Sequence, residues 1–257
     1  MMTRYTCRLN GVDLSDIDPM IYVLDVAIQP PVRDLATTQL AGRDGQTLTK
    51  ATTDSLSVEV KFEIHERDII RRAQIIETVT EWALNGGYLT TNSKPERRLQ
   101  VLCESLPSLD SALKWTGRLT ARFTAYSVPF WEDEYPQTVT VTNNGSVQLI
   151  ASGFAAPARV SATVRNTGSQ AINAVQLTAG NTVISFSGLA LPAGAELKVG
   201  YNENAVFYAR IGENGVLSKR TAESSDELRI PARQKTTLAV STDGTASTRF
   251  DVRGYYL

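Results

Sequence analysis

The sequence has very few of the side chains from which metal sites and nucleophile sites are built. Its 257 residues include one histidine and two cysteines, Cys7 and Cys103. A zinc site rich in histidine or cysteine needs about four such ligands, and a Ser-His-Asp arrangement would have to use His65. His65 follows the polar positions of an alternating segment, residues 56–64, so we expect it on the solvated side of a sheet. The sequence therefore predicts a protein that is not an enzyme and holds no metal or cofactor.

The sequence also lacks an excess of one charge and any long apolar run. The formal net charge is −1, with 15 basic and 19 acidic residues in 1–136 and 11 and 8 in 137–257. Neither half has the excess of basic residues that a protein needs to bind a phosphate backbone, so we expect no sequence-specific nucleic acid binding. The apolar runs fall short of the roughly 20 residues of a membrane helix, and the first residues lack the apolar core of a signal peptide. We expect no membrane partner, no Sec export and two reduced thiols, with a Cys7–Cys103 disulfide as the alternative.

What is present in the first half is a set of strands with one clear helix. Residues 56–64 alternate between apolar and polar side chains, which is typical of an antiparallel sheet covered on one face. From residue 69 the apolar side chains recur every three or four positions, with Asp68 as a candidate N-cap and Asn85-Gly86-Gly87 as a stop signal. The predicted core side of this helix comprises Ile69, Ala73, Ile76, Val79 and Ala83, flanked by Ile75 and the packing residue Trp82.

Two more strands are predicted before the middle of the chain. Residues 97–105 form a short strand and residues 113–130 a longer one, in which Leu119, Ala121 and Phe123 alternate with lysine, arginine and threonine. The polar face of the longer strand either lines a channel or interface, or is an ordinary solvated sheet face.

The second half of the chain has a different pattern. Residues 137–257 contain no tryptophan and no convincing amphipathic helix. Short runs recur about every ten residues with turn residues between them, which predicts a β-sandwich. Residues 137–150, for example, indicate a strand, a turn at Asn144-Gly145 and a second strand. We predict a mainly β protein with an N-terminal α+β domain at 1–131 and a C-terminal β-sandwich domain at 132–257.

The stretch VPFWEDEYP, residues 128–136, lies between the two predicted domains. Pro129, Phe130 and Trp131 are predicted to form the domain junction, because prolines restrain a connector and the two rings can pack between domains. Adjacent Glu132 and Asp133 on an extended strand point to opposite faces, so they do not form the facing carboxylate pair of a glycosidase. A structural junction is favoured over a catalytic acid cluster.

The stretch from Asp25 to Lys50 contains few side chains that look buried, and we expect a long loop there. Long loops in compact domains are commonly functional, so this one is interpreted as an arm that packs on a neighbouring subunit. Within it, GRDG at residues 42–45 fits a tight turn. It lacks the Lys-Ser/Thr pair and the following helix of a P-loop, so phosphate binding is not favoured.

The order of these segments resembles the distal tail protein (Dit) family of phages with long, non-contractile tails. The segments are the GRDG loop, the strand LSVEVKFEI, the helix closing with WALNGGYL, the strand leading to PFWEDE, then FSGLALPAGAEL and the terminal RFDVRGYYL. Together they cover nearly the whole chain. Each motif alone is weak, and the specificity comes from their order and spacing.

The resemblance implies a structural protein of a phage or prophage. Dit-like N-terminal domains, split-barrel-like in fold, form a six-fold ring at the tip of the tail tube, through which the tape measure and then DNA pass. The C-terminal domain is expected to be a galectin-like sandwich that docks baseplate or receptor-binding components. The implied partners are five further copies of the chain, the tail-tube protein, the tape measure and the tail-tip hub and receptor-binding proteins. The expected location is the virion tail tip, after assembly in the host bacterial cytoplasm.

The resemblance also implies which residues contact the adjacent subunit. They belong to the arm that begins at Pro30 and to the GRDG turn. For Arg43 and Asp44 the alternative is a solvated turn. The predicted interface residues are Pro30, Arg33, Gly42, Arg43, Asp44 and Gly45.

Two other functions compete with the structural one. A carbohydrate-binding sandwich for host glycans would need exposed aromatic rings, yet Trp82, Trp115 and Trp131 all precede the sandwich. It would have to use tyrosines, namely Tyr201, Tyr208, Tyr255 or Tyr256. A hydrolase would depend on Glu132 or Asp133.

Overall fold

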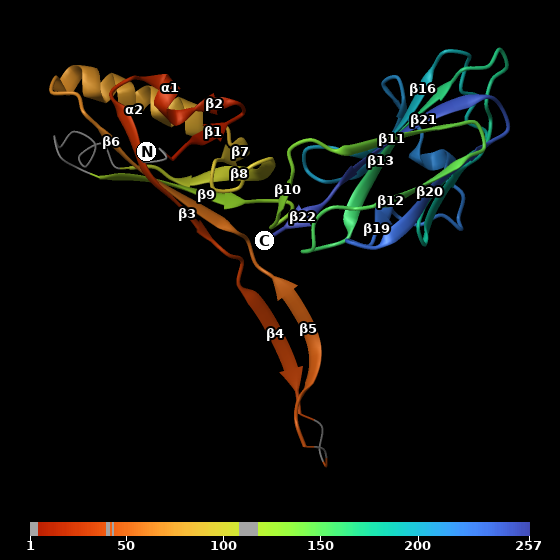
Figure 1. Ribbon diagram of the computed structural model, residues 1–257, viewed down its shortest axis with the longest axis horizontal. Helices are drawn as coiled ribbons and strands as arrows, with labels where there is room; N and C mark the ends of the chain where they lie inside the picture. Colours follow the sequence, from red (N-terminus) through yellow and green to blue (C-terminus); the bar gives the residue numbers. More distant parts are fainter. Residues whose placement is uncertain (1–4, 40–41, 43, 108–117) are drawn as a thin grey trace. The chain divides into compact units, whose positions relative to one another are not determined.

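The computed structural model describes residues 5–39, 42, 44–107 and 118–257, which fold into two compact units (Figure 1). The first unit runs to Trp131 and includes Leu257, and the second is Glu132–Tyr256. Strands dominate both units. The predicted fold class, mainly β with an α+β first part and a β-sandwich second part, is confirmed.

The first unit is built on one antiparallel sheet. Its strands follow the order β2-β1-β7-β8-β9-β6-β3, with β2 and β3 at the two ends. Alternate side chains of β6 and β9 are buried, as their period-2 patterns predict. The strand bounds are β1 Cys7–Leu9, β2 Val12–Asp13, β3 Ile21–Gln29, β6 Ser57–Ile64, β7 Gly87–Thr91, β8 Arg97–Ser105 and β9 Leu119–Ala125.

Helix α2 (Ile69–Leu84) packs on one face of this sheet (Figure 1). Asp68 caps it as predicted, because its side chain accepts a hydrogen bond from the backbone N–H of Ile70 at 2.8 Å. The chain leaves the helix through Gly86, whose φ is +60°. Trp82 packs edge-on against Phe123 with ring centroids 5.9 Å apart, so its predicted role as a packing residue is confirmed.

The predicted core side of α2 was wrong at two positions. Ile69 is 62% exposed, whereas Arg72 is 2% exposed. The Arg72 guanidinium donates to the backbone carbonyl of Glu66, in the turn before the helix. A buried arginine is tolerated where it has such an acceptor, so the helix is rotated from the position that its apolar residues alone indicate.

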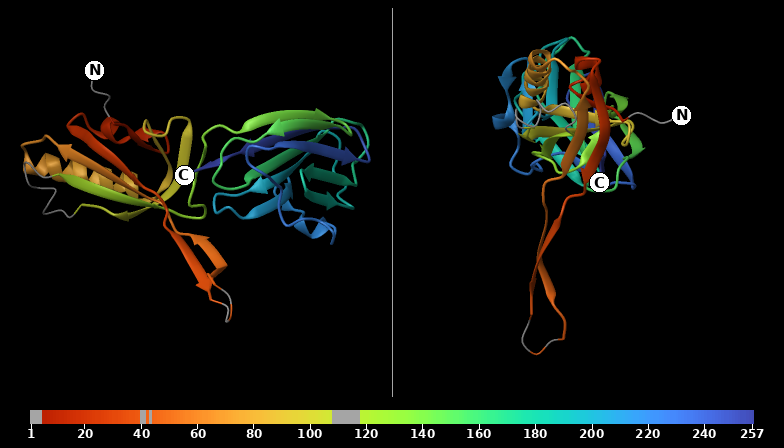
Figure 2. Two further views of the ribbon diagram at one scale, coloured as in Figure 1. Left: turned by 60° about the horizontal axis from the view of Figure 1, so that its bottom comes forward. Right: turned by 90° about the vertical axis from the view of Figure 1, so that its left-hand side faces the viewer.

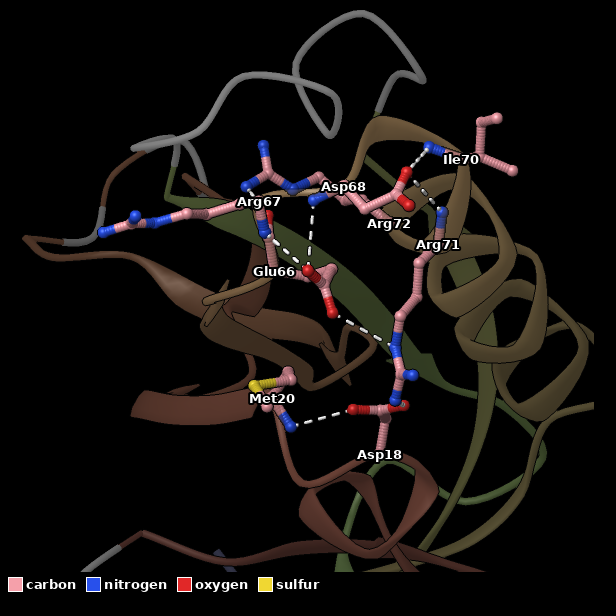
Figure 3. A network of polar contacts seen from close by, with 8 residues as sticks. All are labelled: Asp18, Met20, Glu66, Arg67, Asp68, Ile70, Arg71 and Arg72. Atoms are coloured by element: carbon pink, nitrogen blue, oxygen red, sulfur yellow. Dashed lines mark hydrogen bonds and ion pairs between the residues drawn. The ribbon is translucent and has the colours of Figure 1, made fainter.

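Charged groups join α2 to the short helix α1 (Leu14–Ile17), as Figure 3 shows. Arg71 lies between two carboxylates, with its Nε 3.1 Å from Glu66 Oε2 and its Nη2 3.6 Å from Asp18 Oδ2. Glu66 also accepts hydrogen bonds from the backbone N–H of the next two residues, which fixes the turn into α2. Helix α1 was not predicted, because four residues are too few to show a helical period.

The expected long loop at Asp25–Lys50 is wrong, because most of this stretch is strand. β3 continues to Gln29, and β4 (Arg33–Thr38) then pairs with β5 (Thr47–Thr53) as a two-stranded hairpin. Figures 1 and 2 show that the hairpin continues from β3 and β6 beyond the end of their sheet. Its side chains are exposed on both faces, so the sequence carries none of the apolar alternation that reveals a strand.

The second unit is a sandwich of two antiparallel sheets. The larger follows the order β11-β21-β13-β16-β17-β18, with β19 also paired to β13, and the smaller follows β12-β20-β14-β15. The larger sheet consists of β11 Gln137–Thr142, β13 Ala158–Asn166, β16 Glu196–Tyr201, β17 Phe207–Ile211, β18 Asn214–Gly215, β19 Arg229–Ile230 and β21 Ala246–Arg253. The smaller consists of β12 Ser146–Ile150, β14 Val175–Ala179, β15 Thr182–Phe186 and β20 Lys235–Thr242.

Three further elements complete the chain. They are the strands β10 (Trp131–Asp133) and β22 (Tyr255–Tyr256) and the 3-10 turn η1 (Leu217–Lys219). The predicted strand, turn and strand at 137–150 are present as β11 and β12. They do not form a hairpin, because β11 pairs with β21 in one sheet and β12 with β20 in the other.

The core between the two sheets contains one buried amide. Asn166 is fully buried, and its Nδ2 donates to the carbonyls of Gln170 at 2.8 Å and Leu191 at 2.9 Å. Its Oδ1 accepts from the backbone N–H of Gly168 at 3.0 Å. One side chain therefore satisfies three backbone groups of the loops at this end of the sandwich.

Both cysteines are free thiols, as expected. Burial raises the pKa of Cys7 to about 12, so this thiol stays protonated and unreactive at neutral pH. None of the helices in the described part of the chain is long and apolar enough to cross a membrane.

Candidate functional site

The β4–β5 hairpin is the most exposed element of the first unit. Every residue of its two strands except Thr53 is exposed, including Leu35 at 54% and Leu48 at 55%. A two-stranded ribbon is marginally stable by itself in water. Leu35 and Leu48 thus expose apolar surface on a ribbon that has few stabilising contacts of its own.

A β-bulge places three apolar side chains on one face of the hairpin, beside Arg33, Thr37 and Thr53. Leu35 lies opposite Ala51, and Thr37 lies opposite Leu48, with the register shift between Ala36 and Thr37. Leu35 and Thr37 are two residues apart and share a face, so their partners lie on that face as well. The bulge thus brings Leu35, Leu48 and Ala51 to one side. The opposite face is polar and consists of Asp34, Thr38, Thr47, Lys50 and Thr52, beside Ala36.

The predicted interface residues lie at the two ends of this hairpin. Pro30 and Arg33 are exposed at its base, and Gly42, Asp44 and Gly45 are exposed at its tip. Gly42 and Gly45 have φ values of +80° and +94°, so the tip requires glycine for its backbone conformation. Arg43 lies outside the described residues. That these residues contact a neighbouring subunit stays a prediction.

The sheet face opposite α2 is covered with paired charges. Arg122 on β9 bonds Glu59 on β6, Lys61 lies 3.5 Å from Asp25, and Arg118 lies 3.7 Å from Glu63. The hydrogen bond to Glu59 raises the pKa of Arg122. His65 is exposed beside this face, as predicted, with its Nε2 3.1 Å from Glu63. Because the opposite charges alternate, the face has no strong attraction for a polyanion.

The last strand of the sheet, β3, has an open backbone edge. It pairs with β6 along its length, and no described strand pairs with its other side. Such an edge offers unpaired N–H and C=O groups to a strand of another chain.

The predicted junction residues lie where the chain passes from one unit to the next. Trp131 is fully buried, and Phe130 and Pro129 are half-buried. Their role in fixing the two domains stays a prediction.

Asp133, a candidate of the hydrolase alternative, is engaged in structural hydrogen bonds within the second unit. Its carboxylate accepts from the Ser152 hydroxyl, from the Gly254 N–H at 2.8 Å and from the Tyr256 hydroxyl at 2.8 Å. Arg253 also donates to the carbonyl of Asp133. These bonds tie the start of the unit to its last residues, and they occupy the carboxylate that a hydrolase would need.

We expect Asp133→Ala to lower the free energy of unfolding of the second unit by about 2–4 kcal/mol, because it leaves the Gly254 N–H without its acceptor. Differential scanning calorimetry checks this. Glu134→Ala is the matched control, because Arg253 uses the Glu134 backbone carbonyl, which the change retains. Equal stability of the two variants would contradict the structural role of Asp133.

The tyrosines of the carbohydrate alternative differ in availability. Tyr255 is 3% exposed, Tyr201 donates its hydroxyl to the carbonyl of Leu228, and Tyr256 donates to Asp133. Burial raises the pKa of Tyr201 and Tyr255 well above the ordinary tyrosine value. Tyr208 lies on the outer face of the larger sheet, with Arg210 Cζ 5.2 Å from its ring centroid.

No group of three or more histidine, cysteine, aspartate or glutamate side chains within the described ranges is arranged to hold a metal ion. A cleft of about 280 Å³ lies beside Asp18, Arg71 and Gln74 at the α1–α2 contact. It is open and shows no candidate catalytic group beyond the ion pairs of Figure 3.

Comparison with solved structures identifies the fold. The crystal structure of the Dit protein (gp 19.1) of phage SPP1 superposes with a TM-score of 0.70, at 14% sequence identity, over 98% of this chain and 99% of that one. The fold is that of a phage distal tail protein. The Dit fold accounts for both units at once, since the match covers nearly all of each chain.

Two structures of the phage P2 baseplate in its activated conformation also contain a chain that is similar to this one. The one with Ca matches with a TM-score of 0.58 at 10% identity, over 99% of this chain and 98% of that one. The one with Sr matches with a TM-score of 0.57 at 10% identity, over 97% of each chain. No family model and no curated protein matches the sequence. The predicted resemblance to Dit is confirmed at the level of the fold.

Proposed function

We propose that this protein is a structural component of a phage or prophage tail tip, where it forms a ring at the end of the tail tube. The observation that carries the proposal is the likeness to SPP1 Dit over 98% of this chain and 99% of that one. SPP1 Dit is described as a paradigm of the hub adsorption apparatus in phages that infect Gram-positive bacteria. A match over both units supports a shared role better than a match of one common sandwich.

The first unit, residues 1–131, is the proposed ring-forming domain. Its exposed hairpin would supply an arm, and the open edge of β3 would supply a site for sheet pairing with a neighbour. A contact between two different surfaces of the same chain generates a closed ring when the rotation between copies allows it. The proposed ring is a hexamer.

The proposed inner surface of the ring is the face of paired charges on β6 and β9. DNA passing through a channel must not be held by the channel wall. Ion pairs such as Arg122–Glu59 and Lys61–Asp25 neutralise the cations that would otherwise bind phosphate.

The predicted C-terminal domain, residues 132–257, is the proposed docking domain. Its partners would be the tail-tip hub and receptor-binding proteins, while the ring domain would contact the tail-tube protein and the tape measure. The protein would assemble in the host bacterial cytoplasm and remain in the virion.

The direct test is electron microscopy of the full chain mixed with the tail-tube and hub proteins of the same phage or prophage. We expect rings of six copies at the tube end, and light scattering of the concentrated protein should show species larger than a monomer. Tails that assemble normally without this protein, or a label that maps it away from the tube end, would contradict the proposal.

A further inference from the structure

The outer face of the larger sandwich sheet carries a row of polar side chains across five strands. Cross-strand partners place Thr140, Arg249, Thr163, Lys198 and Arg210 side by side, on β11, β21, β13, β16 and β17. Their neighbours along each strand belong to the buried core, so these side chains point outward. The strands lie about 4.8 Å apart, so the row crosses most of the sheet.

Within this row two cations face each other. Lys198 and Arg210 are directly opposite on adjacent strands. Like charges in this arrangement destabilise a sheet. Their acidic neighbours compensate weakly, because Glu196 lies 3.7 Å from Lys198 and Glu213, itself 96% exposed, lies 3.9 Å from Arg210.

The positive charge of Arg249, in the same row, is paired more closely with a carboxylate. Its Nε donates to Asp251 at 3.1 Å, which is a hydrogen-bonded ion pair. Lys198 and Arg210 have longer ion pairs than Arg249, so they are the least tightly paired cations of this row. An anionic group placed between them would relieve the repulsion and bind both.

An aromatic ring and a hydroxyl lie next to this cation pair. Tyr208 is two residues before Arg210 on the same face, and Gly200 lies opposite it on β16. Gly200 adds no side chain beside the ring, and a Cβ there would come within 2.7 Å of the Ser161 hydroxyl. No side chain at Gly200 therefore rises beside the Tyr208 ring. The Ser161 hydroxyl lies on the far side of Gly200 and can form hydrogen bonds.

We propose that this face binds an anionic glycan, with a phosphate or carboxylate between Lys198 and Arg210 and a sugar ring stacked on Tyr208. Cations recognise the acidic group, while an aromatic face recognises the C–H surface of a sugar and a hydroxyl its polar rim. An acidic peptide would satisfy the cations but would make no use of the surface that Gly200 leaves open beside Tyr208. The site adds recognition of host-surface polymer to the proposed docking role, and it does not depend on ring formation.

The test is isothermal titration calorimetry of the full chain at about 50 and 150 mM salt, where screening lengths differ. The probes are phosphomannan and polygalacturonate as anionic glycans, dextran as a neutral glycan and poly-L-glutamate as an acidic peptide. We expect at least one anionic glycan to bind more tightly than dextran and poly-L-glutamate, and more weakly at the higher salt.

Variants then assign the binding to this face. Lys198→Gln with Arg210→Gln should weaken binding roughly tenfold or more, since two charge-assisted contacts are lost. Tyr208→Ala should weaken binding of the glycan as well. Lys235→Gln, at an exposed position on the smaller sheet, is the matched control and should bind as the natural protein does.

A measurement of stability distinguishes cations that bind a glycan from cations that only stabilise the sheet. Lys198→Gln should leave the melting temperature unchanged or raise it, because it removes a like-charge pair while it weakens binding. The proposal is overturned if neither anionic glycan binds, if the double variant binds as well as the control, or if poly-L-glutamate binds as tightly as the glycans.

Discussion

Replacing residues 33–53 with an Asn-Gly turn should leave the protein folded and abolish its assembly. The backbone N–H of Asp54 donates to the Val32 carbonyl at 2.8 Å, so the two chain ends already face each other as adjacent strands. A two-residue Asn-Gly turn closes such a pair. The removed strands are exposed, so the free energy of unfolding should change by no more than about 1 kcal/mol. Calorimetry and incorporation into tails measure the two effects.

Point variants test which face of the hairpin makes the contact. Leu35→Ser with Leu48→Ser changes two of the apolar side chains that the bulge places on one face, and it should reduce assembly strongly. Thr38→Ser with Thr52→Ser is the matched control on the opposite face and should assemble normally. Assembly by the hairpin-deleted protein would contradict the role of the hairpin as the contact between copies.

The hairpin also shows where prediction from sequence fails. A strand reveals itself through apolar alternation only when one of its faces is buried. β6, with Val58, Val60 and Phe62 fully buried, was therefore predicted, while β4 and β5, exposed on both faces, were interpreted as loop.

Helix α2 shows what local sequence determines well. Its start and end follow from short-range chemistry, namely the Asp68 cap and the positive φ of Gly86. The rotation of the helix about its axis does not follow from local sequence, because the burial of Arg72 depends on the backbone carbonyl of Glu66 in the preceding turn. The first and last residues of α2 were thus predictable, whereas the exposure of Ile69 to solvent was not.

The candidate sites depend on cross-strand register, which the sequence alone does not supply. Lys198 and Arg210 are twelve positions apart, and nothing in the spacing indicates that they lie opposite each other. The same holds for Leu35 and Leu48, which share a face because of a bulge. The residue types were visible in the sequence, and the structure brings them together.

Asn166→Ala should destabilise the second unit strongly. It removes both donors to the Gln170 and Leu191 carbonyls and the acceptor of the Gly168 N–H, at a position that is fully buried. The Leu191 carbonyl still accepts from the Ile172 N–H and the Gly168 N–H still donates to the Thr245 carbonyl, so these two groups each lose one of two partners. We therefore expect a loss of about 2–3 kcal/mol and a melting temperature lower by about 6–15 °C. Asn202→Ala is the matched control, because it removes one exposed hydrogen bond to the Val206 N–H. Calorimetry should show the shift in the transition of the second unit alone, since the first unit has its own core. A shift no larger than that of the control would mean that the loops at this end of the sandwich are held by packing, with the amide contributing little.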